Sequence, residues 1–231
     1  MTALAGRLAV VTGASRGIGA ATAEALAGAG CRVLRVARSL RDAAHGAGHD
    51  VRCDLTDADQ VARLADRIAR EFGPPDIVVN NAGSFLLRSL EETTAAEFDA
   101  QIGINLRASF TLARAILPML RAVGRGCFVS VGSVADHLGL PENAAYAASK
   151  YGLRGLHETL LAEYRGSGVR LTLISPGATD TGAWDPYDPD HRVGFPARAR
   201  MLRPADVADA ILFVATRPPH VLIDWLRLEP A

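Results

Sequence analysis

The stretch Arg7-Leu8-Ala9-Val10-Val11-Thr12-Gly13-Ala14-Ser15-Arg16-Gly17-Ile18-Gly19 decides the fold. Residues 7–12 predict a strand buried on both faces, because the run is apolar and rich in β-branched side chains. The pattern that follows predicts a helix over residues 16–29 that ends at Gly30. The glycines of the connection allow a sharp turn and a close approach of the backbone to a ligand at the positive end of that helix.

This connection predicts a loop that binds a diphosphate. Its spacing, Gly-x-x-x-Gly-x-Gly, differs from the common Gly-x-Gly-x-x-Gly pattern of dinucleotide-binding proteins. An ordinary glycine-rich turn is the alternative when the stretch is considered alone.

Strand and helix alternate along the rest of the chain. Further strands are predicted at residues 32–37, 51–53, 76–79, 127–131, 169–174 and 221–228, and further helices at residues 56–72, 94–123 and 204–216. Gly103 and Pro118 are expected to interrupt the helix at 94–123, and residues 41–50 to form an exposed loop. The pattern predicts an α/β fold, a single doubly wound Rossmann-type domain over residues 1–231 with a mostly parallel seven-stranded sheet.

Composition limits the possible partners. Lys plus Arg and Asp plus Glu both number 25, so no net charge attracts nucleic acid or an anionic membrane, and neither is an expected partner. No apolar run approaches the roughly 20 residues that span a bilayer. Cys31, Cys53 and Cys127 are odd in number and far apart, which predicts reduced, buried thiols and a cytoplasmic protein. His45 and His49 are separated by glycines, so no metal site is predicted.

A phenol and an ammonium occur four residues apart at Tyr146 and Lys150, on one face of a predicted helix that Asn143 can cap. An unperturbed Tyr has a pKa near 10, so half-ionisation at neutral pH needs about 4 kcal/mol of preferential stabilisation of the phenolate. A Lys cation about 4 Å away supplies on the order of 4 kcal/mol at intermediate dielectric, and a cationic cofactor ring would add to this. The pair therefore predicts proton exchange with an alcohol or carbonyl, although an isolated Tyr-x-x-x-Lys is more often an ordinary surface pair.

The end of the second strand predicts which dinucleotide is bound. An acid here would hold the ribose 2′-hydroxyl of NAD, but the residue present is Arg38, followed by Ser39. Arg38 and Arg16 can pair with the 2′-phosphate of NADP, so the sequence favours NADP(H) over NAD(H). A solvated loop cation is the alternative for Arg38, and Arg35 is expected to be structural.

Several polar and small residues follow the other strands, and Ser133 precedes Tyr146 by 13 residues. Together with the Gly-rich turn and the Tyr-Lys pair they resemble, in order along residues 5 to 215, the short-chain dehydrogenase/reductase family. These residues are Asp54, Asn80 to Gly83, Asn105, Ser133, Pro176 and Gly177. By its position among apolar residues of the predicted helix, Asn105 is either a satisfied structural amide or part of a site. Residues 225–230 stand where family members often carry a Gly-rich tail.

The resemblance implies a role for each matched residue. The catalytic set would be Tyr146 as general acid/base, Ser133 polarising the substrate carbonyl, Lys150 holding the nicotinamide ribose, and Asn105 holding a water in a proton relay. The cofactor would be bound by Gly13, Ser15, Arg16, Gly17, Ile18, Gly19, Arg38, Ser39, Asp54, Asn80, Ala82, Gly83, Tyr146, Lys150, Pro176, Gly177, Thr179 and Thr181.

The expected function is hydride transfer between NADP(H) and a small-molecule substrate that is a carbonyl compound or a secondary alcohol, in a homodimer or homotetramer. A non-catalytic cofactor-sensing or scaffold protein of the same fold is the alternative. Residues 178–199 lack periodicity and contain Trp184 and Phe195, which favours a lid over the substrate. Further pocket residues are expected at Phe85, Val134, Ala135, His137, Leu138, Leu140 and Trp184, and they suggest an uncharged, bulky substrate. A solvated loop histidine is the alternative for His137, and a lid that brought Arg192, Arg198 or Arg200 to the pocket would change the substrate preference.

Overall fold

The first strand and helix are present as β1 (Leu8–Thr12) and α1 (Gly17–Gly28) in the computed structural model, which describes residues 4–231. The predicted domain also included residues 1–3, which lie outside the described residues. The other strands are β2 (Arg32–Ala37), β3 (Ala43–His45), β4 (Gly48–Arg52), β5 (Ile77–Asn80), β6 (Gly126–Val131), β7 (Val169–Pro176) and β8 (Trp225–Leu228). The other α-helices are α2 (Ala58–Arg67), α3 (Ala95–Gln101), α4 (Ala108–Val123), α5 (Ala144–Glu163) and α6 (Pro204–Ala215).

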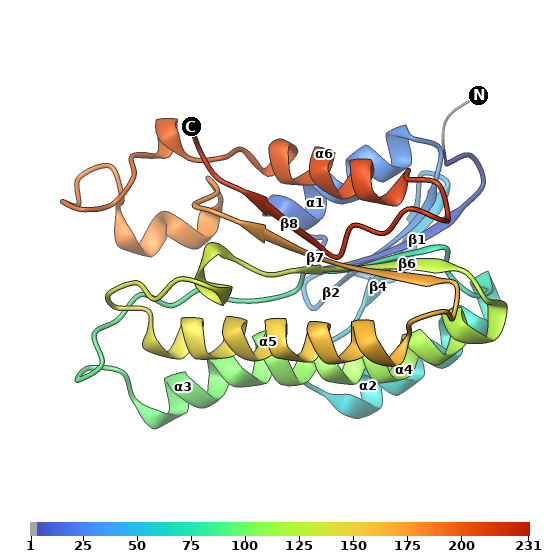
Figure 1. The fold of residues 1–231 in the computed structure, drawn as a ribbon, viewed down its shortest axis with the longest axis horizontal. Helices are drawn as coiled ribbons and strands as arrows, with labels where there is room; N and C mark the ends of the chain where they lie inside the picture. The colour runs from blue at the N-terminus through green and yellow to red at the C-terminus, as the bar shows by residue number, and fades with distance from the viewer. Residues whose placement is uncertain (1–3) are drawn as a thin grey trace.

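The strands form one sheet between two helical layers (Figure 1). Helices α1 and α6 cover one face, and α2, α4 and α5 cover the other. Within β1, Leu8 and Val10 enter the core beneath α2 and α4, whereas Ala9 and Val11 enter the core beneath α1 and α6. This division follows from the alternation of side chains along a strand, and it explains why the strand is apolar throughout.

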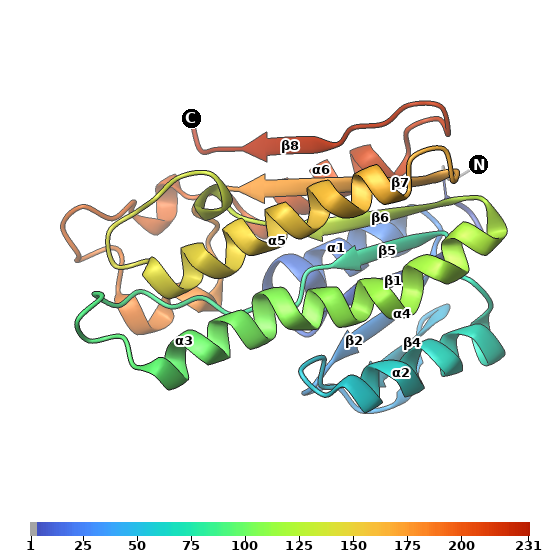
Figure 2. The same cartoon turned by 60° about the horizontal axis from the view of Figure 1, so that its bottom comes forward.

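The strand order among the described residues is β3-β4-β2-β1-β5-β6-β7-β8, and every pairing except β3 with β4 is parallel. Figure 2 shows β1 between the two halves of this sheet. The chain runs from β1 outward to β2 and then returns to β5 on the other side. At such a reversal the connections leave in opposite directions, which makes the carboxyl ends of β1 and β5 the place where α/β proteins commonly bind ligands.

The sheet contains eight strands in the described region rather than the predicted seven. Residues 41–50, predicted to be a loop, instead contain β3 and most of β4, which form an antiparallel hairpin. The signal was weak because β3 is exposed and has no apolar alternation. Arg35 of β2 holds β4 in place through a bidentate ion pair with Asp50 at 2.7 and 2.6 Å, so the predicted structural role of Arg35 is confirmed.

Of the two interruptions predicted in the helical region 94–123, the one at Gly103 is confirmed and the one at Pro118 is wrong. A π-helical turn at Ile102–Arg107, which includes Gly103, separates α3 from α4. Pro118 does not interrupt the helix, because α4 continues through it and buries Leu117 and Leu120 on either side. Packing therefore outweighs the loss of one backbone hydrogen bond.

Asn143 was expected to cap α5, but its side chain makes no capping bond within residues 4–231. Its Nδ2 donates instead to the carbonyl of Pro141 at 3.3 Å.

Cys31, Cys53 and Cys127 are buried free thiols, as predicted, and burial raises the pKa of each to about 11. In the described part of the chain, no helix has both the length and the apolar character needed to cross a membrane.

Candidate active site

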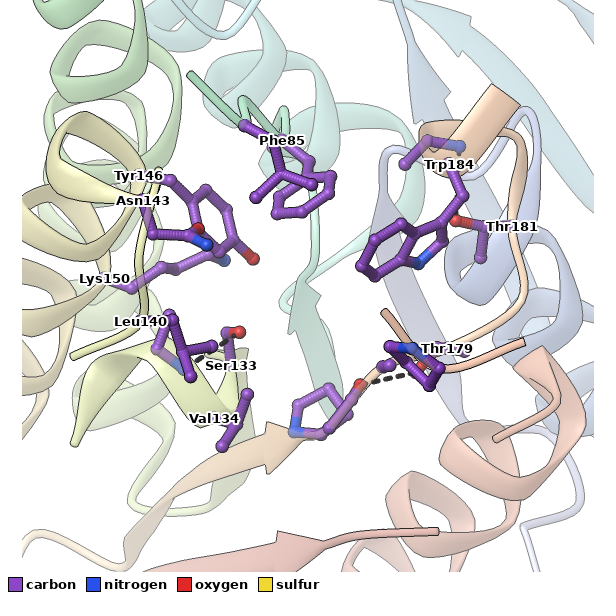
Figure 3. Close-up of a pocket in the computed structure, with 18 of the residues that line it drawn as sticks. Phe85, Ser133, Val134, Leu140, Asn143, Tyr146, Lys150, Thr179, Thr181 and Trp184 are labelled. Carbon is purple, nitrogen blue, oxygen red and sulfur yellow. Dashed lines mark hydrogen bonds between the residues drawn. The ribbon is translucent and has the colours of Figure 1, made fainter. Parts of the chain in front are cut away.

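A cavity of about 640 Å³ lies at the carboxyl ends of β6 and β7. Tyr146, Lys150 and Ser133 all line it, although they come from α5 and from the loop after β6 (Figure 3). Nine of the predicted residues are brought together here: Ile18, Gly83, Ser133, Tyr146, Lys150, Pro176, Gly177, Thr179 and Thr181. The tertiary structure thus joins the Tyr-Lys helix to the Pro176-Gly177 segment, as the resemblance implied.

Ser133 is oriented by its own backbone turn. It begins the 3₁₀ turn Val134–Asp136, and its Oγ accepts a hydrogen bond from the Ala135 backbone N–H at 3.2 Å. Because a hydroxyl carries a single proton, this arrangement leaves that proton to be donated to another group. Ser133 can therefore donate to an oxygen atom placed in the cavity.

Lys150 is buried, and its Nζ donates to the backbone carbonyl of Val131 at 3.0 Å. The same nitrogen lies 5.7 Å from the centre of the Tyr146 ring. Loss of hydration lowers the pKa of Lys150 to about 8. The Lys150 ammonium is therefore held near the Tyr146 ring by the carbonyl of Val131, the last residue of β6.

The pKa of Tyr146 was expected to be lowered by Lys150, and in the free protein this expectation is wrong. Burial raises the pKa of Tyr146 to about 12, Ser133 acts in the opposite direction, and Asp136 adds to the increase. Desolvation penalises the phenolate more than its neighbours stabilise it. Tyr146 is therefore a neutral phenol at physiological pH, the form that can donate a proton.

The Gly-rich turn is closely packed on itself and against the segment that follows β5. A Cβ on Gly13 would come within 2.9 Å of the Ala82 backbone, and a Cβ on Gly19 would come within 2.3 Å of the Gly13 carbonyl oxygen. Arg16, at the N-cap of α1, makes no side-chain cap among the described residues, and the first turn of α1 carries no acid. Backbone N–H groups at this end are therefore suited to an anion such as a diphosphate.

Thr12 fastens this turn to the neighbouring strand. Its Oγ1 accepts from the backbone N–H groups of Asn81 and Ala82 at 3.0 and 3.1 Å, and Asn81 Nδ2 donates back to the Thr12 carbonyl at 2.9 Å. Sequence reasoning named Asn80, Ala82 and Gly83 but gave Asn81 no separate role. The position of Asn81 was the signal that could have identified this role, because it is a polar residue directly after a strand.

Arg38 and Ser39 lie exposed at the end of β2, and Arg16 is exposed at the start of α1. Asp54 accepts from the Thr56 N–H at 3.0 Å and from its hydroxyl at 2.7 Å, and these bonds together with Arg38 lower the pKa of Asp54.

Eleven predicted residues lie outside the cavity lining: Gly13, Ser15, Arg16, Gly17, Gly19, Arg38, Ser39, Asp54, Asn80, Ala82 and Asn105.

Asn105 lies in the π-helical turn and is fully engaged. Its Nδ2 donates to the Ser84 carbonyl and to Ser149 Oγ, both at 3.0 Å, and its Oδ1 accepts from the Ser84 N–H at 2.9 Å. These bonds tie the segment after β5 to the helix that carries Tyr146. The predicted water relay to Lys150 stays a prediction.

Aromatic side chains form the outer wall of the cavity. The ring of Phe85 lies 5.0 Å from that of Tyr146 and 4.9 Å from that of Trp184, measured between centroids. Tyr187 packs on Phe85 at 5.6 Å, and Phe195 packs on Trp184 at 6.2 Å. Of the expected pocket residues, Phe85, Val134, Ala135, Leu140 and Trp184 line the cavity.

His137 and Leu138 are not among the lining residues, although both were expected there. Leu138 is 48% exposed. His137 turns away because its Nδ1 bonds the buried carboxylate of Asp136 at 2.7 Å. Sequence reasoning gave Asp136 no role, since a single acid in a loop carries no signal of burial.

Comparison with known proteins finds relatives along most of the chain. A family model described as short chain dehydrogenase matches residues 7–192. Cis-4-hydroxycyclohexanecarboxylate dehydrogenase of Sinomonas cyclohexanicum is 39% identical over 227 residues, covering 93% of this chain and 91% of the relative.

Two solved structures extend the comparison. A metagenomic short-chain oxidoreductase in complex with NADP is 34% identical, has a TM-score of 0.83 and covers 99% of both chains. An alcohol dehydrogenase from the archaeon Thermococcus sibiricus, complexed with 5-hydroxy-NADP, is 29% identical, with a TM-score of 0.82 and coverage of 96% and 95%. The chain therefore belongs to the short-chain dehydrogenase/reductase family of oxidoreductases.

Proposed function

We propose that this protein is an NADP(H)-dependent carbonyl reductase and alcohol dehydrogenase with Tyr146 as its general acid/base. The observation that carries the proposal is the convergence of the Tyr146 phenol and the Ser133 hydroxyl on one cavity that the Pro176-Gly177 segment also lines. A non-catalytic scaffold would have no chemical need for these groups in one apolar cavity. Fold similarity alone would not distinguish the two functions.

The cofactor is proposed to extend from the end of β2 to the cavity. Gly13, Gly19 and the backbone N–H groups at the start of α1 would bind the diphosphate, and Lys150 would bind the nicotinamide ribose. Arg38 and Arg16 would face the 2′-phosphate. The two NADP-complexed neighbours support this assignment.

When bound, the reduced cofactor supplies the hydride that the reduction requires. Ser133 donates a hydrogen bond to the substrate carbonyl oxygen and stabilises the negative charge that develops there. Tyr146 transfers its phenolic proton to the same oxygen. The aromatic wall excludes water from the cavity during this exchange.

The charges around the cavity favour a neutral substrate. Lys150 is the one cation among its lining residues in the described chain, and its remaining N–H donors are proposed to bind the nicotinamide ribose rather than the substrate. Arg192 pairs with Glu142, and Arg198 pairs with Asp180 and Asp185 at 2.6 and 2.7 Å. A carboxylated substrate would therefore be buried beside apolar rings without a counter-ion, at a cost of several kcal/mol.

A pair of substrates that differ only in charge tests this function. Methyl 4-oxocyclohexanecarboxylate should be reduced with NADPH, followed at 340 nm, with a kcat/KM at least about tenfold above that of the free acid. A panel of ketones and secondary alcohols should be run beside this pair. Absence of turnover across the panel would contradict the enzymatic function, whereas equal use of the acid and the ester would contradict only the neutral-substrate class.

Residues 178–199 are proposed to form a lid over the cavity. They contribute Trp184 and Phe195 to its wall and contain 3₁₀ turns at Gly182–Tyr187 and Arg198–Arg200. Arg198 joins the segment internally, because it bonds Asp180 and Asp185 and lies 3.9 Å from Asp190. These ion pairs of Arg198 are suited to holding the lid in one conformation when ligands occupy the cavity.

Hydrogen exchange should detect closure of this lid. We expect slower exchange of amides 178–199 when NADPH and a ketone are both bound, because ligands order such segments. Arg198→Ala should speed exchange at residues 180–190 and raise KM several-fold, with Arg200→Ala as the matched control. Equal protection with and without ligands would exclude the lid.

Self-association is proposed from an apolar outer surface. Phe110 of α4 is 49% exposed, Val123 of α4 is 42% exposed, and Tyr151 of α5 is 47% exposed. Large apolar side chains on adjacent helices are suited to an interface between copies of the chain.

A further inference from the structure

Behind Ser133 lies a fully buried carboxylate that the proposed chemistry does not use. Asp136 ends the 3₁₀ turn that Ser133 begins, and its side chain is 0% exposed. Its Oδ2 accepts from the Ser133 backbone N–H at 3.1 Å and from Ser175 Oγ at 2.6 Å, and its Oδ1 meets His137 Nδ1 at 2.7 Å. Asp136 therefore links the Ser133 turn to Ser175, next to the Pro176-Gly177 segment.

The hydrogen bonds around Asp136 suit an ionised carboxylate. Trp225 of β8 donates its Nε1–H to Ser175 Oγ at 2.9 Å, and an indole N–H can only donate. The Ser175 proton is therefore directed at Asp136. Since an ionised carboxylate only accepts, His137 Nδ1 must carry a proton as well. The Ser133 N–H, the Ser175 hydroxyl and the His137 Nδ1–H therefore all donate to the Asp136 carboxylate. Trp225 orients the Ser175 hydroxyl.

His137 does not cancel this charge. Its Nε2 is buried without a hydrogen-bond partner among residues 4–231, and its ring packs edge-on against Trp225 at 5.3 Å. A second proton on Nε2 would create a buried cationic N–H without an acceptor, which is costly. The imidazole is therefore neutral, and the Asp136–His137 pair has one net negative charge.

The backbone around Asp136 leaves space for this carboxylate. A Cβ on Gly132 would lie 2.2 Å from Asp136 Oδ2, so only glycine permits the observed position. The Gly132 N–H donates to the Ile174 carbonyl at 2.7 Å, which fixes the end of β6 against β7. Val131, whose carbonyl holds Lys150, is the preceding residue. The buried anion and the buried ammonium are thus held by neighbouring positions of one backbone segment.

The ionisable groups near this charge come from two elements. Tyr146, Lys150 and His157 face it from α5, and His137 faces it from the loop after β6; His157 also bonds the Asp224 carbonyl through Nε2. Asp136 raises the pKa of Lys150, opposing the desolvation that lowers it to about 8. It also raises the pKa of Tyr146. Both effects preserve the protonated forms.

We propose that Asp136 is a positioning residue that holds the Ser133 turn and, as a buried counter-charge, keeps Lys150 protonated at neutral pH. His137, Ser175 and Trp225 support it by directing hydrogen bonds at the carboxylate, so the C-terminal strand β8 becomes part of the support of the site. The inference rests on the proposed function for its effect on turnover. Its electrostatic part concerns the free protein and can be tested without turnover.

Lys150 is the only lysine in the sequence, which makes its titration directly observable. In protein labelled with ¹³C-lysine, the single side-chain Cε resonance should titrate with a midpoint of about 8 in the free wild-type protein. Asp136→Asn keeps the shape of the side chain and removes its charge, and the amide oxygen can still accept from the Ser133 N–H and the Ser175 hydroxyl. The midpoint should fall by about one pH unit, as expected for loss of a unit charge in a partly screened interior.

Asp66→Asn is the matched control, because Asp66 is an exposed acid on α2, which contributes no residue to the cavity within the described chain. It should leave the midpoint of the Lys150 titration unchanged. A folded Asp136→Asn protein with the wild-type midpoint would overturn the proposal.

The pH dependence of kcat should report the same effect of the Asp136 charge. In Asp136→Asn the alkaline limb of the kcat profile for ketone reduction should move to lower pH by about one unit, so that kcat falls about twofold at pH 7 and about fivefold at pH 8. KM should change little, because Asp136 does not line the cavity. If wild-type protein turns over no carbonyl compound, the proposed function fails while the lysine titration still decides the role of Asp136.

A measurement on the wild-type protein covers the case in which Asp136→Asn does not fold. Side-chain ¹⁵N spectra of histidine should show His137 as the neutral tautomer protonated on Nδ1 at pH 7. A His137 imidazolium at this pH would neutralise Asp136 and would overturn its role as a counter-charge.

Discussion

Tyr146→Phe should lose at least about 100-fold in kcat while binding NADPH with near-native affinity. The substitution removes only the phenolic oxygen, and the ring that packs 5.0 Å from Phe85 is retained. In the free protein the phenol is neutral, because burial raises the pKa of Tyr146 to about 12. Loss of the hydroxyl therefore removes the proton donor for carbonyl reduction.

Tyr151→Phe is the matched control, since Tyr151 lies on the same helix, α5, and is 47% exposed. It should retain wild-type kcat. Cofactor affinity measured by fluorescence and thermal unfolding should be unchanged in both variants. If Tyr146→Phe kept more than about a tenth of kcat, the general acid/base assignment would be wrong.

Arg38→Asp should remove the preference for NADPH over NADH and shift it toward NADH. A charge-assisted hydrogen bond to the 2′-phosphate contributes roughly 1.5–3 kcal/mol, which corresponds to about 10- to 150-fold in affinity. Because Arg38 is exposed at the end of β2, solvent screens the interaction, and we expect the lower part of this range. The new acid would accept from the ribose hydroxyls of NADH and repel the phosphate of NADPH.

Dissociation constants for NADPH and NADH, measured by calorimetry, give the ratio without reliance on turnover. Arg41→Asp is the matched control, because it makes the same change of charge at another exposed position of the same loop region. It should leave the ratio close to that of the wild type. Equal binding of both cofactors by the wild-type protein, or an unchanged ratio in Arg38→Asp, would contradict the selection of NADP by Arg38.

Much of the fold could be predicted because its signals are local. A strand buried on both faces must be apolar throughout, so β1 and β6 were visible in sequence, and Gly30 marked the end of α1. The hairpin of β3 and β4 was missed because its stability comes from pairing and from the Arg35–Asp50 ion pair rather than from apolar alternation. Pro118 was misread because the packing of α4 is not a local property.

The sequence by itself determined the family pattern, the alternation of strands and helices, and the residues able to exchange a proton or bind a diphosphate, because spacing and residue chemistry encode them. Only the tertiary structure decided the charge state of Tyr146, the burial of Asp136 behind Ser133, and the pairing of Arg192 with Glu142 and of Arg198 with Asp180. These properties depend on hydration and on the distances between groups far apart in the chain. A sequence lists the ionisable groups, but the fold decides which of them lose water and which of them meet.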